Sequence, residues 1–100
     1  MKPSISTHVL DAARGAPSRG VRVELYRQDQ LLSAQETNED GRIADLAQGH
    51  LQPGTYRLVF HLGAAFFSRF EVEFSVTDAG RHYHIPLLVS PYACTTYRGS

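Results

Sequence analysis

The sequence predicts an all-β protein, folded as a sandwich of two antiparallel sheets. Three observations lead to this fold class. Helical periodicity is hard to find, strand-like alternation of apolar and polar residues recurs at intervals of about ten residues, and turn residues separate the alternating stretches. A chain of 100 residues is expected to form one domain, residues 1–100, with a core of modest size.

The individual elements follow from the alternation and from the turn residues between them. Residues 63–69 fit either a loop or a single helical turn. The pair Asp40-Gly41 predicts a hairpin turn, because glycine adopts the positive φ that such turns need. The expected strands cover residues 4–11, 21–27, 30–37, 42–46, 56–62, 70–76, 81–90 and 92–100.

The strand at residues 81–90 has an unusual second face. Its apolar face holds Tyr83, Ile85, Leu87 and Val89. Its other face holds His82, His84, Pro86, Leu88 and Ser90. This second face resembles neither a core nor a charged, solvated surface. His8 is also a histidine on the polar face of its expected strand, because it points to the face opposite Val9. Two interpretations stay open: surface histidines, which the pattern alone favours, or a functional face at a groove or a contact between subunits.

Composition limits the kinds of binding partner and the cellular location that we expect for the protein. The chain has 10 basic and 10 acidic residues, so its net charge gives no sign of electrostatic capture of nucleic acid or of an anionic membrane. The single cysteine, Cys94, allows no intrachain disulfide and fits a reducing compartment. No apolar run approaches membrane-spanning length, and residues 1–11 lack the apolar region of a secretory signal. A cytoplasmic location is therefore expected.

Isolated candidate residues give weaker signals. His82 and His84 have a spacing that can hold a transition metal, but no further cluster in the sequence completes a site. His50 and His61 are expected to be structural or merely exposed. Cys94 has no basic partner nearby in the sequence, so we interpret it as a small buried residue rather than a nucleophile.

Three stretches together resemble one family. They are "STHVLDAARGAPSRGVRVELYR" from residue 6, "TNEDGR" from residue 37 and "HYHIPLLVSPYACTTYRGS" from residue 82. These stretches are similar to the 5-hydroxyisourate hydrolases, the transthyretin-related enzymes of urate breakdown. The terminal Y-R-G-S is the most specific part, because the hormone-carrying transthyretins lack it. Cys94-Thr95 departs from the family, which usually has a Tyr-Ser pair there.

The resemblance implies a transthyretin-like β-sandwich of two four-stranded sheets. The family has a short helix in the connection that residues 62–70 form here, and the shorter segment implies that this helix is reduced or absent. The resemblance also implies a homotetramer. Dimers form edge to edge through the last strands, and two dimers pack face to face around a channel with active sites at its mouths. Pro86 and Leu88 would pack that second contact, and His84 would face substrate.

The family's functional positions fall on matching residues of this chain. The implied catalytic residues are His8, Arg42 and His84. His8 and Arg42 would also bind substrate, together with the chain end, Tyr97, Arg98, Gly99 and Ser100. The implied substrate is 5-hydroxyisourate, with no metal and no organic cofactor, and neither nucleic acid nor membrane is an implied partner.

The implied reaction is hydrolytic opening of the six-membered ring of the substrate. A histidine is suited to activate water near neutral pH, and Arg42 to stabilise charge on a substrate oxygen. The sequence leaves open whether His84 or His8 holds the proton. The alternative function is a carrier that binds an aromatic molecule in the tetramer channel without catalysis. For a carrier, we would expect apolar or hydroxyl residues in place of the histidines and the Y-R-G-S end.

Overall fold

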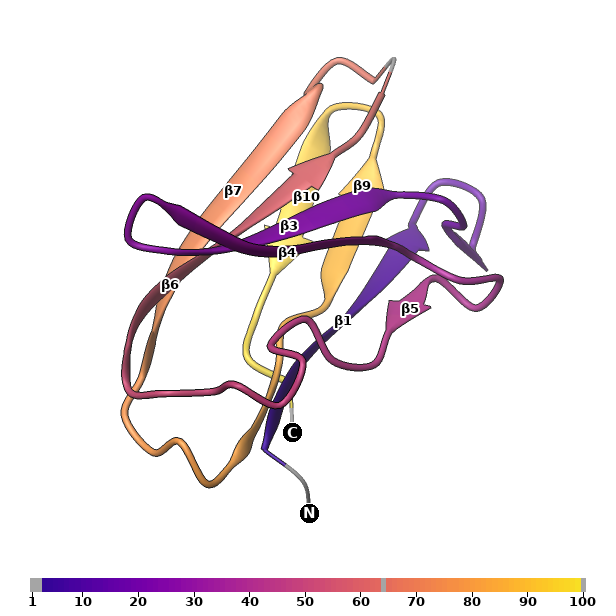
Figure 1. The fold of residues 1–100 in the computed structure, drawn as a ribbon. Helices are drawn as coiled ribbons and strands as arrows, with labels where there is room; N and C mark the ends of the chain where they lie inside the picture. Colours follow the sequence, from indigo (N-terminus) through magenta and orange to yellow (C-terminus); the bar gives the residue numbers. More distant parts are fainter. Residues whose placement is uncertain (1–2, 64, 100) are drawn as a thin grey trace.

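A computed structural model describes residues 3–63 and 65–99, which form β-strands in two sheets and contain no helix (Figure 1). No helix in this part of the chain could therefore cross a membrane. The strands are β1 Ser4–Asp11, β2 Ala16–Pro17, β3 Arg22–Arg27, β4 Gln30–Glu36, β5 Arg42–Ile43, β6 Gly54–His61, β7 Arg69–Val76, β8 His82–His84, β9 Leu87–Ser90 and β10 Ala93–Thr96.

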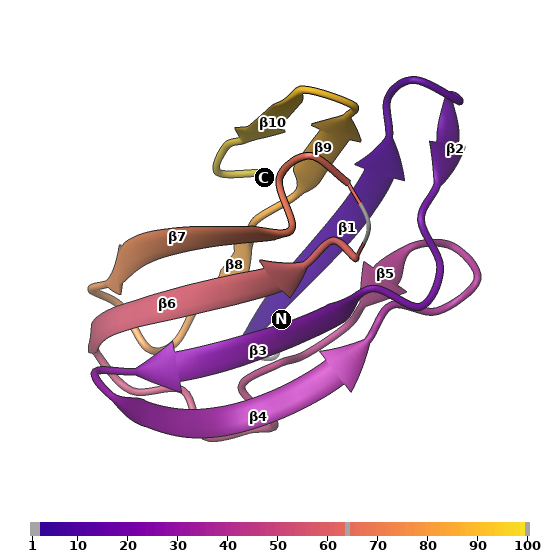
Figure 2. The same ribbon diagram turned by 90° about the horizontal axis from the view of Figure 1, so that it is seen from above.

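One sheet has four antiparallel strands in the order β4-β3-β6-β7 (Figure 2). Its strands keep the predicted alternation of a half-buried sheet. On β7, Phe70, Val72 and Phe74 pack against the core, whereas Glu71 and Glu73 are exposed. The inward residues of β3 and β6 are fully buried, so this sheet forms a continuous apolar layer.

The other sheet has six strands that occupy four positions. Its order is β10-β9-β1-β2, and β8 and β5 also pair with β1. β1 therefore has two short parallel partners on one side, β8 and β9, and two short antiparallel partners on the other, β2 and β5. The expected pair of four-stranded sheets is thus present as two sheets four positions wide, with β1 as the one long strand of the second sheet.

The break between β8 and β9 lies at Ile85 and Pro86. Proline has no N–H to donate to a neighbouring strand, so it interrupts regular pairing. Hydroxyl groups bind the carbonyls at the break: Thr7 Oγ1 donates to Ile85 O over 2.6 Å, and Thr96 Oγ1 donates to Pro86 O over 2.8 Å. Pro86 is buried within the single chain and Leu88 is half-buried, and their expected contact with a second dimer stays a prediction.

The core lies between the two sheets, which appear as separate layers in Figure 2. As the alternation of β1 predicts, Ile5, Thr7 and Val9 point inward and are almost fully buried. The largest fully buried side chains of the core are Tyr56, Phe60, Ile5, Leu25, Leu46, Leu58 and Leu87. Because Thr7 binds a backbone carbonyl, its buried hydroxyl has the partner that such a group requires.

One connection between strands differs from the prediction, and another agrees with it. The turn at Asp40-Gly41 is present, but it does not close a hairpin of paired strands, because β4 pairs with β3 while β5 pairs with β1. The turn instead takes the chain from one sheet to the other. Between β6 and β7, the described residues 62–63 and 65–68 contain bends and no helix, and Leu62 N donates to Ser68 O over 2.8 Å.

Candidate active site

The candidate site forms on the outward face of β1 and of its two neighbours. Residues two apart on a strand share a face, so Ser4, Ser6 and His8 point away from the core. The register places Ser4 beside His82 and Ser6 beside His84 on parallel β8. On the other side of β1, Arg42 of β5 pairs with His8. Strand pairing thus brings residues near 8, 42 and 84 onto one surface.

The tight turn before Arg42 fixes the start of β5. Asn38 Oδ1 accepts hydrogen bonds from Asp40 N over 2.9 Å and from Arg42 N over 3.0 Å. Gly41 has a φ of 72°, and an added Cβ would lie 2.4 Å from Val9 O, so only glycine fits between the turn and β1. The Asp40-Gly41 pair therefore holds Arg42 against the strand that contains His8.

Hydrogen bonds fix both histidines of β8. Ser6 Oγ lies 2.7 Å from His84 Nδ1 and 3.0 Å from His82 Nε2, and Ser4 Oγ is hydrogen-bonded to His82 Nδ1. The two rings are nearly parallel, with an interplanar angle of 15° and centroids 6.3 Å apart. Both rings are half-buried, so their orientation is set by β1 as well as by β8.

A cavity of about 460 Å³ opens at this face. Among the predicted catalytic residues, Arg42 and His84 line it, whereas His8 lies beside it as the strand partner of Arg42. Its full lining is Ser6, Thr7, Asn38, Arg42, Ile43, Ala44, His82 and His84. A cationic guanidinium and an imidazole in one open cavity can bind a polar heterocycle and exchange a proton with it.

The environment of His84 disfavours its charged form. Partial burial lowers the pKa of His84 below its ordinary value, and electrostatic interactions with His82, Arg42 and His8 lower it further. The neutral ring is therefore the dominant form at pH 7, which a proton acceptor requires.

The end of the chain lies beside His84. β10 ends at Thr96, and Gly99 then forms an isolated antiparallel bridge with His84, in which Gly99 N donates to His84 O over 2.7 Å. A Cβ at Gly99 would lie 2.6 Å from Cδ2 of the His84 ring. The strand expected over residues 92–100 is therefore shorter than predicted, since β10 stops before Tyr97.

The other predicted substrate-binding residues lie away from the histidine cavity in the single chain. Tyr97 is exposed, and Arg98 stacks its guanidinium over the ring of Tyr83, 5.0 Å from the ring centroid. Tyr97 and Arg98 line a separate pocket of about 210 Å³ beside Phe74. Ser100, the last predicted site residue, lies outside the described residues.

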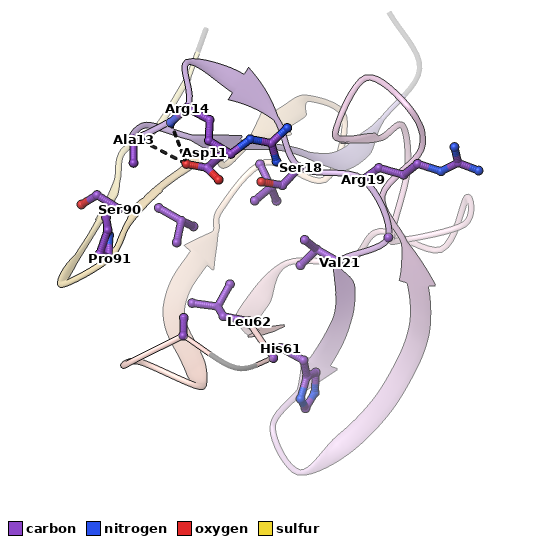
Figure 3. A pocket seen from close by; sticks show the side chains of 15 residues that line it. Asp11, Ala13, Arg14, Ser18, Arg19, Val21, His61, Leu62, Ser90 and Pro91 are labelled. Atoms are coloured by element: carbon purple, nitrogen blue, oxygen red, sulfur yellow. Dashed lines mark hydrogen bonds between the residues drawn. The ribbon is translucent and has the colours of Figure 1, made fainter.

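A further cavity of about 450 Å³, shown in Figure 3, contains none of the predicted site residues. Val21 and Leu62 form part of its wall, with Asp11 and Arg14 nearby (Figure 3). His61 also lines it, but its Nε2 lies 2.7 Å from Glu24 Oε1 and lowers the pKa of that carboxyl group. This pairing agrees with the structural role expected for His61.

Cys94 does not belong to the candidate site. Its half-buried thiol packs against the core, and burial raises its pKa. A raised pKa keeps the sulfur in the unreactive thiol form, which agrees with the interpretation of a structural residue.

Sequence reasoning did not assign five polar residues that line or support the site: Ser4, Ser6, Thr7, Asn38 and His82. A signal for the serines was present. Ser4, Ser6 and His8 repeat at period two, so they share the outward face with the histidine. Asn38 had a weaker signal, because asparagine often caps the turn that follows it.

Comparisons with known proteins identify the family of the chain. The chain matches the model of the HIUase/Transthyretin family over residues 5–99. It is 41% identical to a 5-hydroxyisourate hydrolase of Pseudomonas aeruginosa, over 96% of this chain and 90% of that protein. A 5-hydroxyisourate hydrolase of Deinococcus radiodurans is also 41% identical, over 98% and 97% of the two chains.

Solved structures give the same result. The structure of Klebsiella pneumoniae 5-hydroxyisourate hydrolase has a TM-score of 0.90 at 36% identity, over 97% of this chain and 98% of that one. Sea bream transthyretin in complex with thyroxine has a TM-score of 0.87 at 25% identity, over 96% and 94%. The Pseudomonas match extends over 114 residues, more than the 100 of this chain, so that relative contains residues that are missing here.

The fold and the outward histidine–arginine face define a transthyretin-like β-sandwich protein with a polar site on one sheet. The chain belongs to the HIUase/Transthyretin family. The resemblance read from "STHVLD", "DGR" and "HYHIPLLVSPY" is thereby confirmed, and so is the all-β transthyretin-like fold.

Proposed function

We propose that this protein is a 5-hydroxyisourate hydrolase of urate degradation. The names of its relatives state hydrolysis of 5-hydroxyisourate for those proteins, and we propose that this chain opens the six-membered ring of the same substrate. The observation that carries this function is the convergence of Arg42 and His84 on one cavity beside His8. A chain that only carried a ligand would have no need for an imidazole kept neutral next to a guanidinium.

In the mechanism that we propose, His84 accepts a proton from a water molecule while that water attacks a ring carbonyl. The lowered pKa of His84 supports this role, because the base is already neutral at pH 7. Arg42 stabilises the negative charge that develops on the carbonyl oxygen, for which its permanent charge and planar group are suited. His8, the strand partner of Arg42, orients the water or the substrate from the other side.

The chain end contributes to substrate binding in this proposal. Gly99 acts by its close contact with the ring of His84, which leaves no room for a larger side chain. Tyr97 offers an exposed aromatic face and a hydroxyl group to a flat, polar heterocycle, and Arg98 and Ser100 complete the binding group. Because Tyr97 and Arg98 lie outside the histidine cavity of their own chain, they would act at a site shared with a second subunit.

The assembly that would create such shared sites is a homotetramer. β10 and β7 are edge strands of their sheets, and an unpaired edge can add a strand from another copy. The outward face of β1, β8 and β5 would then meet the same face of a second dimer and enclose the site. The free thiol of Cys94 fits the reducing conditions of the cytoplasm, the location that we propose.

The test is direct. The protein is added to freshly formed 5-hydroxyisourate, and the decay of ultraviolet absorbance is compared with the spontaneous background. We expect an acceleration that is proportional to protein concentration. A carrier would instead show saturable binding without faster decay, and that outcome would replace the proposed function with the alternative.

A further inference from the structure

Hydrogen bonds join two serines of β1 and two histidines of β8 into one continuous row. The order is Ser4, His82, Ser6, His84: Ser4 Oγ binds His82 Nδ1, His82 Nε2 lies 3.0 Å from Ser6 Oγ, and Ser6 Oγ lies 2.7 Å from His84 Nδ1. The parallel register of β1 and β8 produces this row, because it places both serines beside both histidines on the outward face.

Ser6 holds the position between the two rings. Only 8% of Ser6 is exposed, so little bulk water competes for its hydroxyl group. A hydroxyl donates one hydrogen and accepts others, and it can therefore receive a proton on one side while it releases its own on the other. The two distances at Ser6 Oγ are both those of normal hydrogen bonds, which such an exchange requires.

His84 keeps one ring nitrogen outside this row. In the part of the chain that the structure describes, its Nδ1 is bonded to Ser6, and no hydrogen bond engages its Nε2. The same ring lines the cavity of about 460 Å³. Nε2 is thus the ring nitrogen that is left for water or substrate, whereas Nδ1 is bonded to the protein.

We propose that Ser6 and His82 form a proton relay behind His84. This inference rests on the proposed hydrolase function and deepens it. As water attacks the substrate, the proton of water moves to His84 Nε2, and the hydroxide forms the new bond to the ring carbonyl. His84 Nδ1 passes its proton to Ser6 Oγ, and Ser6 passes its own to His82 Nε2. The relay leaves His84 neutral and Ser6 a hydroxyl, the positive charge is on His82, and the carbonyl electron pair is on the substrate oxygen as an oxyanion. When the oxyanion collapses, the ring C–N bond breaks, and the leaving nitrogen takes up the proton as the relay runs in reverse.

Electrostatics give a reason for moving the charge. The titratable and charged groups that act on His84 among the described residues are His82 of β8, Arg42 of β5 and His8 of β1. Burial and these neighbours disfavour a positive His84. A base that must stay neutral next to Arg42 works better if it passes the proton on, and His82 receives it with Ser4 as acceptor for its Nδ1–H.

The test uses a cycle of variants in the full-length protein, assayed for 5-hydroxyisourate decay. Ser6→Ala removes the bridge, and His82→Gln keeps a hydrogen-bonding group that cannot take up the proton. We expect each to lower kcat by about tenfold or more while KM stays within about twofold. The double variant should be no slower than the slower single variant. Once the relay is broken at one residue, a second substitution in the same relay causes no further loss of rate.

Two further variants separate the relay from a loss of folding. Ser6→Thr keeps the hydroxyl group and should restore at least about a third of the activity that Ser6→Ala loses. His50→Gln, at an exposed histidine away from the site, should leave kcat unchanged. Measured in mixtures of water and deuterium oxide, wild-type kcat should show a solvent isotope effect to which several moving protons contribute. The isotope effect on kcat of Ser6→Ala should come from a single moving proton. Wild-type kcat in Ser6→Ala, or multiplied losses in the double variant, would overturn the relay.

A spectroscopic measurement tests the relay without relying on turnover. The ring ¹⁵N shifts of the wild-type protein should show His84 and His82 as neutral rings protonated at Nδ1, the forms that donate to Ser6 and Ser4. A His84 ring protonated at Nε2 would overturn the direction of the relay. If substrate decay is not accelerated but both rings have the expected form, the hydrolase function is wrong and the hydrogen-bonded row stands.

Discussion

At the scale of single residues, His84 is fixed by neighbours from three parts of the chain. Ser6 of β1 binds its Nδ1, Gly99 lies against its ring, and the charge of Arg42 on β5 helps to keep it neutral. A catalytic base needs this kind of support, because small errors in its position reduce the rate strongly. Substitutions at His84, His8 and Arg42 should therefore have different effects on activity.

Replacing His84 or His8 by alanine should reduce activity without unfolding the protein. Both side chains are only half-buried on the outward face, so alanine leaves no cavity in the core. General acid–base groups contribute about a hundredfold or more, and we expect kcat/KM to fall by that amount for His84→Ala. Thermal unfolding followed by circular dichroism should stay close to that of the wild type. Full activity in either variant would remove that histidine from the mechanism.

Substitutions at Arg42 should separate charge from shape in a pH profile. His84 acts as a base in its neutral form, and its lowered pKa places the acidic limb of kcat/KM below the ordinary histidine value of about 6.5. Arg42→Gln removes a positive neighbour, which raises the pKa of His84, so the limb should move to higher pH. Arg42→Lys keeps the charge and should keep the limb, but it loses the planar group and should lower kcat. Wild-type activity in the lysine variant would show an exposed cation without a catalytic role.

At the scale of elements, the site depends on two short strands and an isolated bridge. β5 and β8 have two and three residues, and each is held by the long β1. The bridge between Gly99 and His84 adds the end of the chain to this arrangement. These elements are too short to be stable alone, so the rigidity of the site depends on their pairing with β1.

Gly99→Ala should displace the ring of His84. Gly99 has no positive φ, so alanine is compatible with the backbone, but its Cβ would lie 2.6 Å from the ring. We expect kcat to fall by about tenfold, with a melting temperature within a few degrees of the wild type. Gly80→Ala is the matched control, because a Cβ there would meet only an Asp78 carboxylate oxygen at 3.2 Å. Equal activity in both variants would show that the ring has room to move.

The sequence predicted the strands well because alternation is a local property. Ile5, Thr7 and Val9 point inward as their spacing requires, and the outward position of His84 was visible from the pattern of residues 81–90. The pairing of these strands depends on contacts between distant residues, and the local alternation of a strand does not show which strand it pairs with. The burial of Pro86 was missed for this reason, and so were the contacts of Ser6 with His82 and His84, 76 and 78 residues away.

At the scale of the whole molecule, Tyr97 and Arg98 face a different pocket from the histidines. If they bind substrate, a second copy of the chain must supply one of the two groups. Sedimentation at micromolar protein concentration should therefore give four chains per particle. Dilution to monomers should abolish activity together with the tetramer. A fully active monomer would contradict the shared site and leave the chain end without its proposed role.

The central position of β1 also has a consequence for biosynthesis. β3, β4, β6 and β7, all within residues 22–76, leave the ribosome before β8 and β9 and can pair with one another as they emerge. β1 is made first, yet its parallel partners are made almost last, and contacts between distant segments form slowly. Until then β1 lacks its partners on one side, and its inward residues Ile5 and Val9 stay without part of the core that buries them in the folded protein. The surface that holds His84 can be completed only after Gly99 has left the ribosome.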